Sequence, residues 1–366
     1  MQNKQSVPFN GLIGQTKAKR RLNFYLKGYN ATGICPHIMF IAPKGCGKTM
    51  MAKAMGKLLL SSEEVDDSGD AKPKPFLEIN CSTLKNVKQL VNQVLIPHVQ
   101  HKEATILFDE CSELPRDITM ALLTMLNPNP ENKTTFSYDD YVLDFDFSRH
   151  TFMFATTEAQ SVFHALMDRC ERVDLEEYTY SELGKIVKLT LPSVDFEDGL
   201  LDDIATVLRG NARAAQKMAN NMAIYLKAKG SKKFSHADWK EIQFELGIAP
   251  LGLSPIEIQI LGELGKVKDC SLTHLAAKTG LTKACVQRDF EMHLQKMDLM
   301  QITTAGRAIT KAGKDYLDLL GEIEELEVDK KFLARGKKAK PVTIKLPKGM
   351  IQTITKMPNG FMPKKN

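Results

Sequence analysis

Five short apolar runs divide the first half of the chain, and the stretches between them favour helices. The apolar runs occupy residues 37–40, 76–80, 104–108, 151–155 and 172–175. The helical stretches cover residues 17–26, 50–60, 84–98, 118–126 and 165–170. Strands that are apolar at successive positions are typical of sheets buried on both faces, and alternation of such strands with helices is typical of a parallel sheet. The pattern therefore predicts an α/β fold with helices flanking a parallel sheet.

Three other stretches of this half are predicted differently. Residues 1–8 are expected to be disordered. Residues 61–70 are rich in Ser, Asp and Glu, and we expect them to form a solvated, mobile loop. Residues 134–138 and 141–145 alternate in period two around Asp139 and Asp140, which predicts a β-hairpin.

The second half is predicted to be helical up to residue 246 and then to change character. Its helices are expected to start at Ser181 and to cover 200–208, 210–227 and 239–246. Helices over 255–264, 272–278 and 283–297, followed by strands around 300–302 and 308–309, predict a winged helix. We therefore expect four parts, namely an α/β domain at 1–178, a small helical lid domain at 179–248, a winged-helix domain at 249–320 and a basic disordered tail at 321–366.

The positive charge of the chain is concentrated at its end. The formal net charge is +6 over 366 residues, yet residues 330–366 alone carry eleven Lys and Arg side chains and no acid. The remainder holds 39 basic and 44 acidic side chains, a net charge of −5. The tail is interpreted either as a solvated terminus that aids solubility or as a non-specific contact to nucleic-acid phosphates.

Composition excludes several classes of protein. No apolar run has the length of a membrane span, and the N-terminus lacks the apolar region of a signal peptide. The seven cysteines are scattered and include no C-x-x-C pair, which argues against a zinc site or a disulfide framework. Reduced thiols and the absence of a membrane segment predict a cytoplasmic protein.

The first apolar run leads into a candidate phosphate-binding loop, Ile41-Ala42-Pro43-Lys44-Gly45-Cys46-Gly47-Lys48-Thr49. A strand, a glycine-bearing loop, a Lys-Thr pair and a helix in this order can cradle phosphate oxygens on backbone N–H groups. Lys48 would reach the β- and γ-phosphates, and the Thr49 hydroxyl would hold Mg²⁺. Ala42 stands where the strict motif has glycine, which would restrict the turn if φ were positive. The competing interpretation is a strand-to-helix turn without catalytic meaning.

Polar groups follow two later apolar runs. Asp109 and Glu110 end the run at 104–108. Asp109 would bind Mg²⁺, and Glu110 would orient and deprotonate the attacking water. Thr157, after the run at 151–155, would sense the γ-phosphate and position water. The competing interpretation for these groups is an ordinary polar strand end.

Taken together, these motifs and their order resemble the RuvB family, AAA+ motors that drive branch migration of Holliday junctions. Ile13-Gly14-Gln15 resembles the adenine-side turn of the family, and the phosphate loop and Asp109-Glu110 are similar to its two Walker motifs. Leu166-Met167-Asp168-Arg169 resembles the run that carries the arginine finger. The segment around Tyr178 resembles the one that lies beside adenine, and Arg209-Gly210-Asn211-Ala212-Arg213 resembles the sensor-2 run.

The resemblance implies an AAA+ P-loop domain, a helical lid and a winged helix, with ATP and Mg²⁺ as ligands. Catalytic roles are expected for Lys48, Asp109, Glu110, Thr157, Arg169 and Arg213. Nucleotide contacts are expected from Ile13, Gly45, Cys46, Gly47, Lys48, Thr49, Met50, Tyr178 and Arg213. Thr49 and Asp109 are expected to hold the metal, and Arg307 to contact DNA.

The resemblance also implies partners and a biological role. We expect an ATPase that acts on four-way junction or duplex DNA in recombination and repair, as a homo-hexameric ring in which Arg169 acts on the neighbouring subunit. A RuvA-like junction-binding protein is a further expected partner, and no membrane is involved. Two alternatives stay open, a clamp-loader or helicase-loader ATPase of DNA replication and a DNA-binding regulator whose ATPase site is vestigial.

The chain departs from the family pattern at several positions. Ala42 replaces glycine, Ala212 replaces proline and Met167 replaces the first arginine of the finger run. In the wing, residues 301–307 keep only Arg307 of an arginine-rich turn. The hairpin at 134–147 is shorter and more acidic than the hairpin that binds a partner in the family.

Overall fold

The computed structural model describes residues 8–100, 102–126, 133–138, 141–147 and 150–321. The chain divides into two units, and the boundary between them in the sequence falls between Leu251 and Gly252. The expected disordered lead lies almost entirely outside the described residues, and so does the expected tail.

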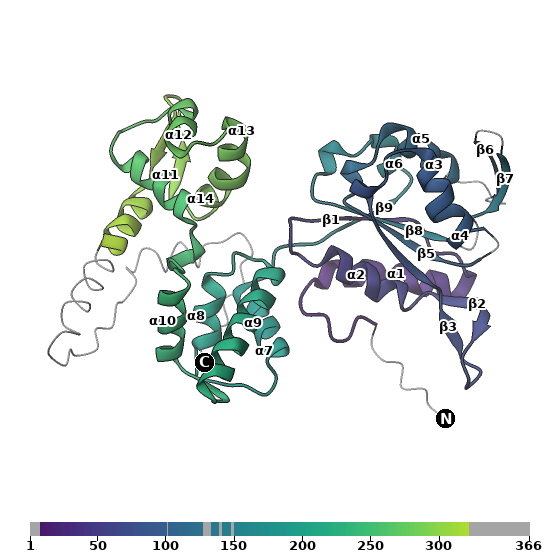
Figure 1. Ribbon diagram of the computed structural model, residues 1–366, viewed down its shortest axis with the longest axis horizontal. Helices are drawn as coiled ribbons and strands as arrows, with labels where there is room; N and C mark the ends of the chain where they lie inside the picture. The colour runs from purple at the N-terminus through teal and green to yellow at the C-terminus, as the bar shows by residue number, and fades with distance from the viewer. Residues whose placement is uncertain (1–7, 101, 127–132, 139–140, 148–149, 322–366) are drawn as a thin grey trace. The chain divides into compact units, whose positions relative to one another are not determined.

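The first unit is built on a five-stranded sheet (Figure 1). Its strands are β1 (Ile38–Ile41), β4 (Phe76–Asn80), β5 (Thr105–Asp109), β8 (Thr151–Thr156) and β9 (Glu171–Asp174). They lie in the order β4-β5-β8-β1-β9, and every neighbouring pair is parallel. The predicted α/β fold with a parallel sheet is confirmed.

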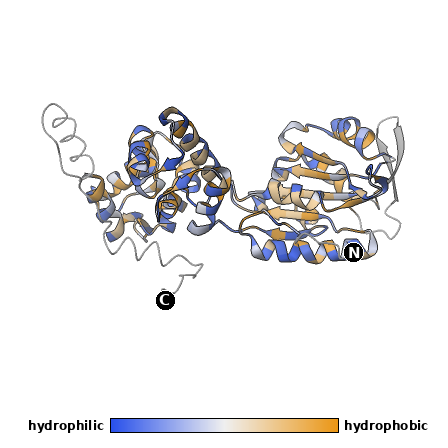
Figure 2. Cartoon of the chain, turned by 90° about the horizontal axis from the view of Figure 1, so that it is seen from below, coloured by the Kyte–Doolittle hydropathy of each residue, from blue (hydrophilic) through white to orange (hydrophobic). Residues whose placement is uncertain are grey.

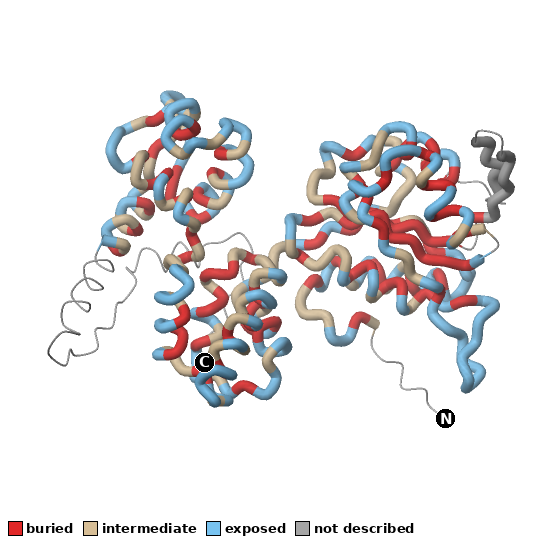
Figure 3. Tube along the Cα trace, viewed as in Figure 1, coloured by how far each residue is buried: buried red, intermediate tan, exposed pale blue. Residues whose placement is uncertain are grey.

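Both faces of the sheet are buried because apolar side chains occupy successive positions along each central strand (Figures 2 and 3). In β8, Phe152 and Phe154 enter one core, whereas Met153 and Ala155 enter the other. Since side chains alternate across a strand, an unbroken apolar run must serve two faces. One face packs on α1 (Thr16–Thr32) and α2 (Lys48–Gly56), and the other on α3 (Val87–Leu90), α5 (Arg116–Met125) and α6 (His164–Met167).

The helix predicted over 84–98 is shorter at its start and irregular in its middle. It begins at Val87 because the side chain of Asn86 accepts a hydrogen bond from the N–H of Gln89 and caps it. A π-helical segment, Val91–Leu95, separates α3 from α4 (Ile96–His98).

The prediction that residues 61–70 form a loop is wrong for residues 61–65, which lie in a strand, whereas residues 66–70 form the turn that follows it. Helix α2 ends at Gly56, where a Cβ would lie 2.3 Å from the ring of Phe76. The chain then forms a two-stranded antiparallel hairpin, β2 (Leu60–Val65) and β3 (Ala71–Pro73).

The base of this hairpin is held by a buried carboxylate. Glu103 accepts hydrogen bonds from the Ser61 hydroxyl at 2.6 Å and from the Ser62 N–H at 2.9 Å. Burial alone would raise the pKa of Glu103, but these bonds outweigh it and lower the pKa below its usual value. The strand thus depends on a partner about 40 residues away, which local composition does not reveal.

The one hairpin that the sequence predicts, around Asp139 and Asp140, is confirmed. Strands β6 (Lys133–Tyr138) and β7 (Tyr141–Asp146) pair in antiparallel register, with Tyr138 opposite Tyr141. Its turn, Asp139 and Asp140, lies outside the described residues.

A helical region follows the sheet within the first unit. It contains α7 (Tyr180–Thr190), α8 (Leu200–Thr206), α9 (Ala212–Lys229) and α10 (His236–Glu245). Its core holds Leu183, Ile204, Met222 and Trp239. Thr179, Asn211 and Ser235 cap three of these helices with their side-chain oxygens, which satisfies N–H groups that a helix start leaves unpaired. A short parallel pair that the pattern does not predict, β10 (Asp195–Phe196) and β11 (Lys233–Phe234), joins two of its loops.

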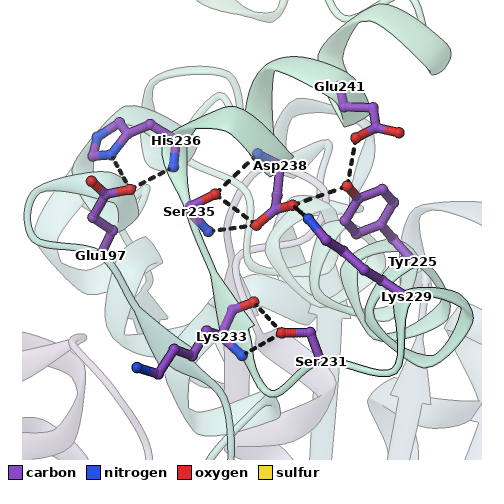
Figure 4. A network of polar contacts seen from close by, with 9 residues as sticks. All are labelled: Glu197, Tyr225, Lys229, Ser231, Lys233, Ser235, His236, Asp238 and Glu241. Carbon is purple, nitrogen blue, oxygen red and sulfur yellow. Dashed lines mark hydrogen bonds and ion pairs between the residues drawn. The ribbon is translucent and has the colours of Figure 1, made fainter.

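A buried aspartate ties the last two helices of this region together (Figure 4). Asp238 accepts hydrogen bonds from the N–H and hydroxyl of Ser235, from the hydroxyl of Tyr225 and from the ammonium of Lys229. Burial alone would raise the pKa of Asp238, but these donors outweigh it and hold the pKa well below its usual range. The single proton of the Tyr225 hydroxyl is shared between Asp238 and Glu241, whose carboxylate oxygen lies 2.6 Å from that hydroxyl at the exposed rim of the network.

The second unit contains α11 (Pro255–Gly265), α12 (Leu272–Thr279), α13 (Lys283–Cys285) and α14 (Met292–Lys296), the last two joined by a π-helical segment, Val286–Glu291. Strands β12 (Met300–Ile302) and β13 (Arg307–Ile309) pair in antiparallel register, and residues 311–321 are helical. The elements predicted for a winged helix are therefore present. Among the described residues, no helix combines the length and the hydrophobicity needed to span a membrane.

The Asp238 network makes a prediction about stability. Replacing Asp238 with Asn should lower the free energy of unfolding of the helical region by about 1.5–3 kcal/mol at pH 7, because charge-assisted hydrogen bonds to a buried carboxylate are lost. Trp239, the single tryptophan of the chain, is buried next to this site, so its fluorescence during urea unfolding reports on this region.

The contribution of Asp238 to the free energy of unfolding should depend on pH. A depressed pKa stabilises the folded state above the pKa of the unfolded aspartate, about 4, and the contribution is lost as pH falls below it. The difference between wild type and Asp238→Asn should therefore shrink below pH 4. Glu241→Gln, on the exposed side of the same tyrosine, is the control and should change stability little; an equal loss in both variants would contradict the assignment.

Candidate active site

The predicted phosphate loop connects β1 to α2 at the carboxyl edge of the sheet. Gly45 and Gly47 have φ of 79° and 90°, which favour glycine, whereas Ala42 lies outside the left-handed region. Ala42 donates its N–H to the carbonyl of Thr156 at 3.3 Å, and its methyl group is buried in the core. The replacement of glycine by Ala42 is therefore unstrained.

Lys48 opens α2 and turns back over the loop. Its Nζ donates to the carbonyl oxygens of Ala42 at 2.8 Å and of Pro43 at 3.2 Å. Burial lowers the pKa of Lys48; the carboxylates of Asp109 and Glu110 oppose this effect. Because the ammonium group is already partly removed from water, it loses less hydration when it binds an anion.

The two residues expected to hold a metal are in direct contact. The hydroxyl of Thr49 donates to Oδ2 of Asp109 at 2.8 Å, across the edge of the sheet from α2 to β5. Hydroxyl and carboxylate oxygens are the ligands that Mg²⁺ prefers, so the residues present fit such an ion. The structure thus brings together the predicted metal pair.

Glu110 occupies a strained conformation directly after β5. Its φ of 57° and ψ of 47° are left-handed, which few residues other than glycine adopt. Its N–H donates to Oδ1 of Asp109 at 3.0 Å, so both oxygens of that carboxylate are engaged. Such strain, of order 1–3 kcal/mol, is concentrated at functional sites.

Thr157 lies just beyond the carboxyl end of β8. Ala155 in that strand is in register with Asp109, and Thr156 is in register with Ile41 at the end of β1. Thr156 itself is fully buried and accepts a hydrogen bond from the N–H of Glu158, so the half-exposed residue of the pair is Thr157. Thr157 thus directly follows Thr156, whose carbonyl accepts a hydrogen bond from the N–H of Ala42 in the phosphate loop.

Arg169 lies at the amino ends of the strands, opposite the ends that carry the phosphate loop. It precedes β9, whose first residue, Glu171, is in register with Ile38 at the start of β1. The phosphate loop follows the other end of β1, and each strand residue adds about 3.3 Å of length. The Arg169 guanidinium donates to the carbonyl of Ala165 at 2.9 Å. Within one chain, the structure therefore does not bring Arg169 to the phosphate loop.

The segment expected to lie beside adenine, Ile13-Gly14-Gln15, contacts the part of the chain that follows β9. The side chain of Gln15 donates to the carbonyl of Glu176 at 2.6 Å and accepts from its N–H at 3.0 Å. Tyr178 follows, and its hydroxyl would lie 3.0 Å from a Cβ on Gly47. Ile13 packs with Tyr178 against the core of the helical region. Gln15, which was not among the expected site residues, thus fixes the backbone that precedes Tyr178.

The remaining expected nucleotide contacts differ in exposure. Cys46 is 1% exposed and belongs to the core beneath the loop, so its backbone is what it can offer to a ligand. Met50 is 51% exposed on the first turn of α2. Arg213 is exposed in the first turn of α9.

Arg307 is engaged inside the second unit. Its guanidinium forms a bidentate ion pair with Glu291, at 2.9 and 3.3 Å, in which the Arg307 side chain is 15% exposed and that of Glu291 is 0% exposed. The ion pair engages Nε and one terminal nitrogen of Arg307, and the expected DNA contact stays a prediction.

A residue missed in the sequence is Asn211. It caps α9 and donates from Nδ2 to the carbonyl of Lys44 in the phosphate loop at 3.3 Å. An Asn immediately before a helix is a readable cap signal. Its second bond, to a loop 167 residues away in sequence, is not readable.

The sheet and this constellation lie in a part of the chain that matches a known family. Residues 38–178 match the family model of AAA, the ATPase family associated with various cellular activities. The chain thus carries an AAA ATPase domain.

The chain is also similar to individual proteins over most of its length. It is 24% identical over 321 residues to the Holliday junction branch migration complex subunit RuvB of Wolbachia sp. subsp. Brugia malayi, covering 84% of this chain and 91% of the relative. It is 23% identical over 325 residues to RuvB of Thermosipho melanesiensis, covering 85% and 96%. The solved structure of the Thermotoga maritima RuvB Holliday junction branch migration motor matches with a TM-score of 0.67 at 20% identity, over 86% and 97%. The expected resemblance to RuvB is confirmed as a distant similarity.

The geometry of the loop makes a prediction about Gly45. A Cβ at this position would lie 1.9 Å from the Asn211 side chain, on a backbone of positive φ. Gly45→Ala should therefore displace Asn211 and expose the start of α9, seen as faster hydrogen–deuterium exchange of the amides of Arg213 and Ala214.

Ala42→Gly is the matched control, because it changes the same loop at a position of ordinary φ. It should leave exchange at Arg213 and Ala214 unchanged. Equal exchange in wild type and Gly45→Ala would contradict the contact.

Proposed function

We propose that this chain is an ATP-hydrolysing ring motor that acts on DNA and drives branch migration of Holliday junctions. The observation that carries the proposal is that the candidate catalytic residues lie at opposite ends of the strands of one sheet. Lys48 and Asp109 lie at the carboxyl edge, whereas Arg169 lies at the amino edge. An arginine can then reach the phosphates from a second copy of the chain, as arginine fingers do. Similarity to branch migration subunits over 84–85% of the chain supports the choice of substrate.

In this proposal the phosphate loop binds the triphosphate of ATP. Lys48 would exchange the carbonyls of Ala42 and Pro43 for phosphate oxygens, and loop N–H groups would add hydrogen bonds. Thr49 and Asp109 would hold Mg²⁺, which when bound would neutralise charge on the phosphates.

Glu110 is the proposed general base. Its carboxylate would accept a proton from the attacking water, while Thr157 at the neighbouring strand end would orient that water. The rigid connection of Glu110 to Asp109 favours a fixed distance between base and metal ligand. Arg213, two residues after the helix cap Asn211 that bonds to the phosphate loop, would sense whether the γ-phosphate is present.

Arg169 of the adjacent subunit would complete each site, so hydrolysis would require assembly into a ring, which we propose has six members. Changes at the nucleotide would move the helical region as a lid and carry DNA along. The winged helix and the basic tail are the proposed DNA contacts, a RuvA-like protein is a proposed partner, and the cytoplasm is the proposed location.

The test is ATP-dependent dissociation of a synthetic four-way junction by the purified chain. We expect ATPase activity that rises with junction DNA, and conversion of the junction to duplexes only with ATP and Mg²⁺. Glu110→Gln should bind ATP but neither hydrolyse it nor dissociate junctions. DNA-stimulated hydrolysis without junction dissociation would favour the loader alternative, and no hydrolysis would favour a vestigial site.

The division of the site predicts complementation between two inactive variants. Arg169→Ala should lower ATPase activity by about 10³-fold or more, because an arginine finger contributes about 10³–10⁵ in rate. In a mixture, Glu110→Gln subunits supply Arg169 to neighbours that keep Glu110, so activity should return in part.

Co-purification of differently tagged subunits would establish that mixed rings form. If mixed rings stay inactive, or if Arg169→Ala alone hydrolyses ATP at the wild-type rate, the assignment of Arg169 to a neighbouring site is wrong.

A further inference from the structure

The start of α9 is hydrogen-bonded to the outer side of the phosphate loop. The amide Nδ2 of Asn211 donates to the carbonyl of Lys44 at 3.3 Å. The backbone N–H of Ala212 donates to the carbonyl of Gly45 at 3.0 Å. Two successive carbonyls of the loop are therefore held by two successive residues of the helical region, and we call this pair of bonds the latch.

The latch depends on the residues that this chain has at both positions. Ala212 is the first residue of α9, and it stands where the RuvB pattern has proline, which has no N–H to donate. The Gly45 carbonyl would then have no partner at this point. Alanine at this position therefore supplies a hydrogen bond that proline could not make.

Asn211 is fixed in the rotamer that the latch needs. Its Oδ1 accepts from the N–H groups of Arg213 at 2.9 Å and Ala214 at 3.1 Å, which caps the helix. Because both side-chain atoms are engaged, the cap orients Nδ2 toward Lys44. Gly45 has no side chain to obstruct this approach, since a Cβ there would lie 1.9 Å from Oδ1.

The held carbonyls determine the direction of neighbouring N–H groups. In a planar trans peptide, the C=O of one residue points opposite to the N–H of the next. Fixing the carbonyls of Lys44 and Gly45 therefore fixes the N–H groups of Gly45 and Cys46 on the other side of the loop. Oriented N–H groups that need no rearrangement bind phosphate more strongly than mobile ones.

We propose that Asn211 and Ala212 are positioning residues that latch the lid onto the phosphate loop and so slow nucleotide release. This inference rests on the proposed function as an ATPase and adds how the lid is coupled to the nucleotide. With nucleotide bound, the latch would hold the start of α9 against the phosphate loop, so both bonds would have to break before the lid could move away.

Two variants break one bond each while keeping the start of α9. Asn211→Asp keeps a good helix cap but sets a carboxylate against the Lys44 carbonyl. Ala212→Pro removes the N–H donor, and proline is favoured at the first position of a helix. Asn211 is extended, with φ of −111° and ψ of 113°, which suits a residue before proline.

The experiment measures release of a fluorescent ADP analogue from the full-length protein after a chase with unlabelled ADP. Each variant should release it about threefold to tenfold faster than wild type, the change expected for one hydrogen bond. Asn220→Asp, an exposed position in the middle of α9, makes the same chemical change away from the loop and should match wild type.

Trp239 fluorescence during urea unfolding separates positioning from folding. Unchanged unfolding with faster release supports the latch, whereas lower stability with unchanged release, or wild-type release in both variants, overturns it. Failure of the wild type to bind the analogue would overturn the proposed function together with the latch. Faster release in variants of a protein that leaves junctions intact would support the latch and count against the motor.

Discussion

The parallel arrangement of the five strands is the constraint on which the site depends. Since every strand runs the same way, all carboxyl ends meet at one edge, and β1 lies between β8 and β9 so that its loop has neighbours on both sides. Lys48, Thr49 and Asp109 meet at this edge although two of them are about 60 residues from the third. The same constraint keeps Arg169, which precedes β9, at the far edge.

Sequence reasoning succeeded where one residue's neighbours in the chain decide its structure. Unbroken apolar runs such as the one at 104–108 identify strands because a side-chain period of two fills two cores at once. The loop from Ile41 to Thr49 is recognisable because glycine is needed at Gly45 and Gly47, whose φ values are positive.

It failed where the decisive partner is distant. Residues 61–65 form a strand because Glu103 satisfies Ser61 and Ser62, whereas their own polar composition predicted a loop. The tolerance of Ala42 depends on its φ, which a motif does not report. Asn211 is readable as a cap, but its bond to Lys44 exists only once the helical region is folded against the loop.

The ion pair inside the winged helix links two positions of the chain in a different way. Glu291 is fully enclosed, and Arg307 reaches it from the strand that returns from the wing. Loss of the arginine alone would leave a carboxylate unpaired in the interior, at about 3–5 kcal/mol, whereas an apolar pair of similar volume can replace both at little cost. The two positions are therefore expected to covary in evolution, changing together from charged to apolar and seldom one at a time.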